Sequence, residues 1–149
     1  MLTKVTIAKK LTASSDKAWE AISKIGRLDV WFPSIATCNV NGDGVGAHRY
    51  MTLHRGGEII DRIVDINAVK RRLIYQRIES PFPVTSYTGT VEVFDSFDSQ
   101  AIIVWTVDFD SDPKDSSTVA EALRAGIGAG VDGMERDLQT AMRLETSVR

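Results

Sequence analysis

The chain has 149 residues, of which 43% are hydrophobic and 26% are charged, and its formal net charge is -2. These values are typical of one soluble domain that is large enough to bury a core, and we treat residues 1–149 as a single domain. The small net charge, without a run of like charges, argues against nucleic acid as a partner. The first residues lack the apolar segment of a secretory signal, and no stretch approaches the length of a membrane span. We therefore expect a cytoplasmic protein without integral membrane association.

Alternation of polar and apolar residues predicts a strand over residues 4–11. Ser14 or Ser15 can then cap a helix that ends at Gly26, and residues 28–35 predict a short second helix that ends at Pro33. The next part of the chain has β-rich runs separated by turn residues, which is typical of an antiparallel meander. The expected strands are 35–40, 47–53, 58–66, 71–78, 85–94 and 101–109.

Apolar residues recur on one helical face from Thr118 to Glu145, which predicts a long terminal helix. A helix with one apolar face must bury that face against another element, and each strand of an antiparallel sheet has one apolar face. A curved seven-stranded antiparallel sheet wrapped around the terminal helix, with two short helices after the first strand, satisfies both needs. We therefore predict an α+β fold.

Four segments, in this order, resemble the START-like superfamily, which is also called SRPBCC and has the helix-grip fold. The segments are 16–35 (DKAWEAISKIGRLDVWFPSI), 42–53 (GDGVGAHRYMTL), 75–93 (YQRIESPFPVTSYTGTVEV) and 104–109 (VWTVDF), followed by the long helix. The chain looks most similar to the polyketide cyclase/dehydrase and lipid-transport group. This resemblance implies a cavity between sheet and terminal helix for a small hydrophobic or amphipathic molecule. It does not imply one reaction, because the superfamily contains cyclases, lyases, receptors and carriers.

Candidate ligand-binding residues follow from strand alternation and from this resemblance. We expect Trp105 to face inward, and Gln76 to face inward as a polar orienting group. Arg49 shares a face with apolar residues, where a guanidinium needs either an internal carboxylate or an anionic ligand. The phenol of Tyr87 could donate to a ligand oxygen or act as a weak general acid. The full set is Arg49, Met51, Leu53, Gln76, Phe82, Tyr87, Trp105, Leu123, Gly126, Gly130 and Met134.

The facing of Asp61 and Arg62 is open at this stage. A two-residue turn at Gly56 and Gly57 would pair Arg62 with Met51 and turn Arg62 inward. The resemblance to receptor-type members instead places a cavity carboxylate nearer Asp61. A shift of one residue exchanges the two faces of a strand, so only one of these side chains can face the cavity.

Metal and nucleotide sites lack support in the sequence. His48 and His54 would lie about 20 Å apart along one strand face, and no third ligand joins them, so we predict no metal site. Residues 128–133, GAGVDG, match a dinucleotide-binding motif, but they interrupt a helical segment, so we predict no cofactor. We expect the helix face of Gly126, Gly130 and Met134 either to widen the cavity or to allow close packing on the sheet.

Three functions remain open. The first is a small-molecule binding or carrier protein. The second is a cofactor-independent enzyme of the cyclase or dehydratase type, acting on a carbonyl compound with Arg49, Asp61 or Tyr87 as catalytic candidates. The third is a protein-interaction module with a filled cavity, which exposure of Trp31 or Phe32 would favour.

Overall fold

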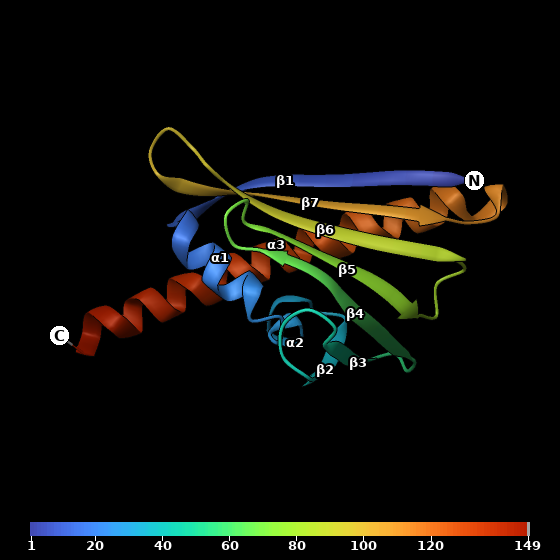
Figure 1. Ribbon diagram of the computed structural model, residues 1–149, viewed down its shortest axis with the longest axis horizontal. Helices are drawn as coiled ribbons and strands as arrows, with labels where there is room; N and C mark the ends of the chain where they lie inside the picture. Colours follow the sequence, from blue (N-terminus) through green and yellow to red (C-terminus); the bar gives the residue numbers. More distant parts are fainter. Residues whose placement is uncertain (149) are drawn as a thin grey trace.

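The computed structural model describes residues 1–148 and contains a seven-stranded antiparallel sheet with a long C-terminal helix (Figure 1). The elements in chain order are β1 (Leu2–Ser14), α1 (Ser15–Ser23), α2 (Leu28–Trp31), β2 (Ile35–Asn41), β3 (His48–Leu53), β4 (Glu58–Asn67), β5 (Arg72–Glu79), β6 (Ser86–Asp95), β7 (Gln100–Asp110) and α3 (Pro113–Val148). This order confirms the predicted α+β helix-grip fold.

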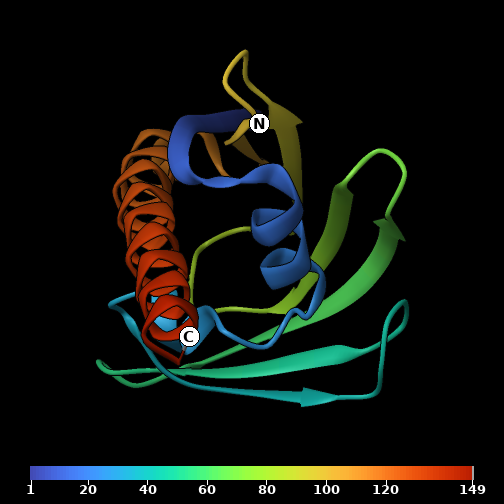
Figure 2. The ribbon, with the colours of Figure 1, turned by 90° about the vertical axis from the view of Figure 1, so that its left-hand side faces the viewer.

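The strands lie in the order β1-β7-β6-β5-β4-β3-β2. Strands β2 to β7 therefore form a meander, and the first strand, β1, pairs with the last strand, β7. Figure 2 shows the strands as a curved wall, with α3 across its open side. Helix α2 lies against the middle of α3, near Gly130 and Gly133. Along β7 every second residue is buried, and Trp105 lies on the buried face as predicted. This alternation places one apolar face of the sheet toward α3.

Helix α3 begins at Pro113, five residues before the predicted start at Thr118. Proline suits the first turn of a helix because its missing N–H has no partner there. The Asp112 side chain accepts a hydrogen bond from the backbone N–H of Lys114 at 3.3 Å, which supports the same start. Although α3 is long, no helix among residues 1–148 combines the length and hydropathy of a membrane span.

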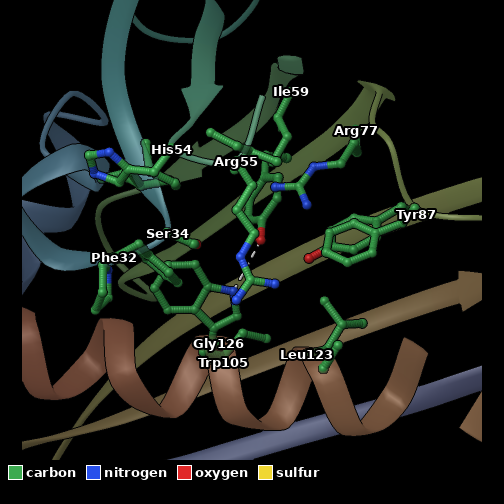
Figure 3. A pocket seen from close by; sticks show the side chains of 18 residues that line it. Phe32, Ser34, His54, Arg55, Ile59, Arg77, Tyr87, Trp105, Leu123 and Gly126 are labelled. Atoms are coloured by element: carbon green, nitrogen blue, oxygen red, sulfur yellow. Dashed lines mark hydrogen bonds between the residues drawn. The ribbon is translucent and has the colours of Figure 1, made fainter. Parts of the chain in front are cut away.

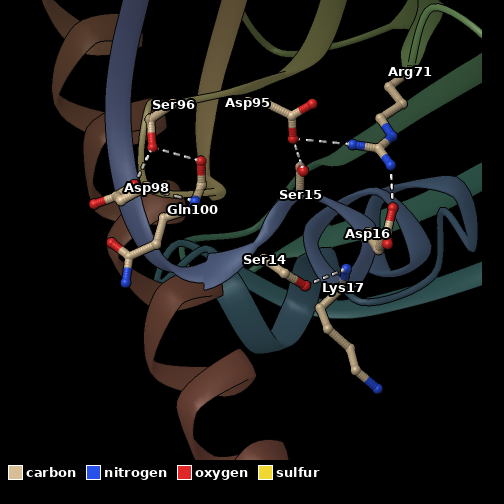
Figure 4. A network of polar contacts seen from close by, with 9 residues as sticks. All are labelled: Ser14, Ser15, Asp16, Lys17, Arg71, Asp95, Ser96, Asp98 and Gln100. Atoms are coloured by element: carbon tan, nitrogen blue, oxygen red, sulfur yellow. Dashed lines mark hydrogen bonds and ion pairs between the residues drawn. The ribbon is translucent and has the colours of Figure 1, made fainter.

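The start of α1 is fixed to two hairpin ends by a polar network (Figure 4). Ser15 donates to Asp95 at the end of β6, and Arg71, between β4 and β5, donates to Asp16 and Asp95. Ser14 caps α1 by accepting from the backbone N–H of Lys17 at 3.2 Å. Two side chains at the start of α1, Ser15 and Asp16, therefore contact residues of both hairpin ends.

Two glycines of α3 allow α2 to approach closely. A Cβ atom on Gly133 would lie 2.0 Å from the carbonyl oxygen of Trp31, and one on Gly130 would lie 2.3 Å from the Phe32 ring. Asp137 adds to this contact by accepting from Arg27 at 2.7 Å and from the indole N–H of Trp31 at 2.9 Å. The close approach that these glycines permit is thus between two helices, rather than between helix and sheet.

Candidate functional site

A cavity of about 630 Å³ lies between the sheet, α3 and the loops around α2 (Figure 3). Most of the side chains that line it are apolar, and they come from parts of the chain far apart in sequence. The lining residues are Leu28, Phe32, Pro33, Ser34, Ile35, Leu53, His54, Arg55, Ile59, Tyr75, Arg77, Phe82, Tyr87, Trp105, Ala122, Leu123, Gly126 and Ile127.

Exposed loop residues mark the mouth of the cavity. Ser34 and His54 are exposed lining residues, and the backbone N–H of His54 donates to the carbonyl oxygen of Ser34 at 3.1 Å. Arg55 is also exposed, and its side chain points into the cavity in Figure 3. Gly56 and Gly57 follow with φ of 91° and 100°, a region that side chains rarely adopt. The loop that presents Arg55 therefore depends on these two glycines.

Aromatic side chains form one wall of the cavity. The rings of Phe32 and Trp105 meet edge to face, with centroids 5.4 Å apart. The indole N–H of Trp105 donates to the hydroxyl oxygen of Tyr75 at 3.1 Å, inside the protein. Tyr75 lies across from Gly89 in the β5–β6 pair, and a Cβ atom on Gly89 would lie 2.1 Å from the Tyr75 ring. Glycine at position 89 thus leaves the space that the Tyr75 ring occupies.

A buried ion network lies beside this wall. Asp61 is 0% exposed and accepts from Arg49 Nη2 through Oδ2, and from Arg77 Nε through Oδ1, each at 2.9 Å. Burial raises the pKa of Asp61, but Arg77 and Arg49 lower it by more, so this pKa lies below its ordinary value. Arg49 also donates from Nη1 to the carbonyl oxygen of Ile25 at 3.3 Å. The carboxylate of Asp61 is therefore ionised at neutral pH and held by two cations.

Arg77 connects the ion network to the cavity. Its guanidinium carbon lies 4.2 Å from the centroid of the Tyr87 ring, and both side chains line the cavity. Burial lowers the pKa of Arg77, whereas the neighbouring Tyr87 and Asp61 raise it by more, so Arg77 remains a cation. Burial, with Tyr87 nearby, raises the pKa of Tyr75 well above its ordinary value, so its phenol stays neutral. The polar part of the cavity is therefore rich in hydrogen-bond donors.

The structure brings about half of the predicted ligand-binding residues to the cavity. Those that line it are Leu53, Phe82, Tyr87, Trp105, Leu123 and Gly126. Arg49 and Met51 lie buried on the inward face of β3 but are not among the lining residues, because Asp61 holds Arg49 and Met51 is part of the core. Whether any of the six lining residues binds a ligand stays a prediction.

Three candidates lie away from the cavity, and the inward facing predicted for Gln76 is wrong. Gln76 is exposed on the outer face and accepts from Arg62 at 3.0 Å, because β5 turns its other face inward. Gly130 lies against Phe32, since α2 covers α3 at this point. Met134 is 0% exposed in the core and is not among the residues that line the cavity. The cavity face of α3 is thus confined to its part near Gly126.

The register of β3 and β4 differs from the one that a two-residue turn predicts. Met51 pairs with Ile59 rather than with Arg62, and Arg49 pairs with Asp61. The turn is longer, because the backbone N–H of Leu53 bonds to the carbonyl oxygen of Gly57 at 3.1 Å. Asp61 therefore faces inward and Arg62 outward, as the resemblance to receptor-type members implied.

Tyr75 and Arg77 are lining residues that the sequence patterns did not identify. They share one face of β5, and Arg77 pairs directly with Asp61 of β4. The signal that could have identified Arg77 is that a buried aspartate needs cations on neighbouring strands. Arg55 was not among the candidates, and it lies in the loop after β3. Among residues 1–148 no cluster of histidine, cysteine, aspartate or glutamate side chains could hold a metal ion.

Comparisons with solved structures agree with the fold. The protein XoxI from Bacillus cereus superposes with a TM-score of 0.82 at 21% identity, over 92% of this chain and 96% of that one. Norcoclaurine synthase from Thalictrum flavum, in complex with dopamine and hydroxybenzaldehyde, gives 0.77 at 21% identity, over 94% and 88%. Zhui aromatase/cyclase from Streptomyces sp. R1128 gives 0.78 at 17% identity, over 93% and 94%. At these identities the similarity shows the fold.

Comparison with curated proteins finds no match. A family model described as polyketide cyclase/dehydrase and lipid transport matches residues 3–139, which is most of the chain. The chain therefore belongs to the polyketide cyclase/dehydrase and lipid transport family.

Proposed function

We propose that the protein binds a small hydrophobic or amphipathic molecule in the cavity between the sheet and α3, as a ligand-binding or carrier protein. The observation that carries this proposal is the cavity itself. Its volume of about 630 Å³ is in the range of small-molecule sites, and a few polar groups interrupt its mainly apolar lining. The complex of norcoclaurine synthase with dopamine and hydroxybenzaldehyde gives independent support, because that protein shares the fold.

An enzyme of the cyclase or dehydratase type is the second candidate, and the tyrosines favour it. Tyr75 and Tyr87 both line the cavity, and their phenols could donate a proton or a hydrogen bond to a carbonyl oxygen. Asp61 and Arg49 are poorly suited to proton transfer, since they are paired with each other. Conversion of a bound carbonyl compound by the wild type, and its loss in Tyr87→Phe, would favour the enzyme over the carrier.

The interaction-module hypothesis has less support. It required a filled cavity or exposed aromatic anchors near α2. Trp31 is only 3% exposed, and Phe32 packs against Trp105 inside the cavity. These side chains therefore contribute little to an outer surface.

Two glycines of α3 provide a matched test of the cavity. Gly126 lines the cavity and Gly128 does not, and a Cβ atom on either would have nothing within 4 Å. Leucine at position 126 should occupy the space a ligand needs, whereas leucine at position 128 changes the same helix outside the lining. Both variants replace a glycine, so both gain a similar helix propensity.

The probe is a neutral dimethylaminonaphthalene dye whose emission reports an apolar environment. We expect the wild type and Gly128→Leu to bind it alike, and Gly126→Leu to bind it at least about tenfold more weakly. Native mass spectrometry of freshly purified wild type and Gly126→Leu provides a second readout, because a co-purified small molecule should be lost in the variant. Equal dye binding by Gly126→Leu, or no binding by the wild type, would contradict the proposal.

A further inference from the structure

The ion network beside the cavity has one more positive charge than negative charge. Arg49, Asp61 and Arg77 form two ion pairs through a single carboxylate, so the three side chains together carry a charge of about +1. The side chains of Asp61 and Arg49 are 0% and 3% exposed, and that of Arg77 is 9% exposed. A buried charge is costly unless a counter-ion meets it.

Of the two arginines, Arg77 is the one that lines the cavity. Arg49 uses its remaining nitrogen on the carbonyl oxygen of Ile25. Arg77 donates only through Nε to Asp61, and its two terminal nitrogens have no acceptor among residues 1–148. The Tyr87 ring lies against this guanidinium, with the ring centroid 4.2 Å from the guanidinium carbon. In Figure 3 the side chains of Arg77 and Tyr87 both point into the cavity.

The other polar groups of the cavity reinforce this charge. Arg55 adds a second cation at the mouth, and no aspartate or glutamate is among the lining residues. The hydroxyl oxygen of Tyr75 accepts from Trp105, while its hydrogen has no acceptor among residues 1–148. The polar end of the cavity therefore offers several donors and little that would attract a cation.

Resting on the proposed function, we propose that the ligand is an amphipathic monoanion whose carboxylate-type head binds Arg77 and whose apolar tail lies against Phe32, Trp105 and Leu123. A guanidinium and a carboxylate match in geometry as well as in charge, since two parallel N–H groups meet two oxygens. The hydroxyl groups of Tyr75 and Tyr87 are the further donors to this head. The tail would cover apolar surface that the cavity otherwise exposes to water.

The test compares phenylbutanoate, phenylbutanol and phenylbutylamine, which share one tail and differ in the charge of the head. Binding to the wild type is measured by calorimetry at neutral pH. We expect phenylbutanoate to bind at least about tenfold more tightly than phenylbutanol, and phenylbutylamine to bind weakest. Equal or tighter binding of the alcohol or the amine would overturn the proposal.

Two arginine variants test whether Arg77 causes the preference for the carboxylate. Arg77→Gln removes the cavity cation, and Arg62→Gln removes the same charge from the exposed face of β4. We expect the preference for the carboxylate to fall to near parity in Arg77→Gln and to persist in Arg62→Gln. A persistent preference in folded Arg77→Gln would overturn the proposal. Circular dichroism checks folding, and if Arg77→Gln does not fold, the wild-type ranking of the three compounds decides alone.

The outcomes separate this inference from the proposed function. Binding of the neutral dye without binding of phenylbutanoate overturns the inference and leaves the proposed function standing. Failure of the dye and of all three phenylbutyl compounds to bind overturns both.

Discussion

Alanine at Gly133 tests the close contact of α2 with α3, which positions one end of the cavity. The new Cβ atom would lie 2.0 Å from the carbonyl oxygen of Trp31 and 2.8 Å from its carbonyl carbon. These are backbone atoms, so α2 must move to relieve the contact. The matched variant is Gly126→Ala, where the Cβ atom would have nothing within 4 Å.

The two variants should change stability in opposite directions. Replacing glycine by alanine inside a helix stabilises it by about 1 kcal/mol, and Gly126→Ala should show this gain. Overpacking costs about 1–3 kcal/mol, and a rigid backbone contact favours the upper end of that range. Gly133→Ala should therefore be less stable than the wild type by about 2 kcal/mol. The difference of roughly 3 kcal/mol between the variants corresponds to about 6–12 °C in Tm.

Denaturant and thermal unfolding followed by circular dichroism measure both variants. Amide hydrogen exchange of residues 27–32 provides a local readout, because movement of α2 should speed exchange there in Gly133→Ala only. If Gly133→Ala were as stable as Gly126→Ala, with unchanged exchange in α2, the close contact would not exist as described.

The ion network and the polar contacts of two tryptophans give four further predictions. Asp61→Asn should destabilise the protein by about 3–5 kcal/mol in denaturant unfolding, because it leaves two buried guanidiniums without their carboxylate. A loss of stability below about 1 kcal/mol would contradict this pairing. The pKa of Asp61 is depressed in the folded state, so its contribution to the free energy of unfolding should be complete above about pH 4, near the pKa of an unfolded aspartate. This contribution should decline as the pH falls through the lower pKa of the folded state. The stability difference between wild type and Asp61→Asn should therefore shrink in acid. Tyr75→Phe should cost about 1–3 kcal/mol, because the buried indole N–H of Trp105 loses its acceptor, and an unchanged unfolding midpoint would refute that hydrogen bond. Asp137→Ala should cost a similar amount through the N–H of Trp31 and should speed hydrogen exchange in α2, whereas unchanged exchange would show that Asp137 does not hold this helix.

Most of the fold was predictable because its signals are local. Alternation along residues 101–109 and a recurring apolar face after Thr118 predict the last strand and the long helix directly. The errors lie at ends and turns. Helix α3 begins at Pro113 rather than at Thr118, and proline is well suited to the first turn of a helix. Element ends depend on single capping contacts, which the apolar periodicity does not contain.

The cavity was harder to predict because it depends on register. Gly56 and Gly57 suggested a two-residue turn, whereas both residues belong to a longer loop, and this difference exchanges the faces of β4. On β5 Gln76 was expected to face inward, whereas Tyr75 and Arg77 are the lining residues and Ile78 is 55% exposed. A buried arginine is recognisable only when its partner on the next strand is known. The sequence predicts a cavity, and the registers determine which polar groups line it.

Methyl NMR during titration with phenylbutanoate tests the central claim most directly, namely that a small molecule binds between the sheet and α3. We predict that the largest shift changes fall on lining methyl groups such as those of Leu53, Leu123 and Ile127, with little change at Leu11, a core residue that does not line the cavity. Changes confined to surface methyl groups such as those of Val69, which is 96% exposed, would contradict the account.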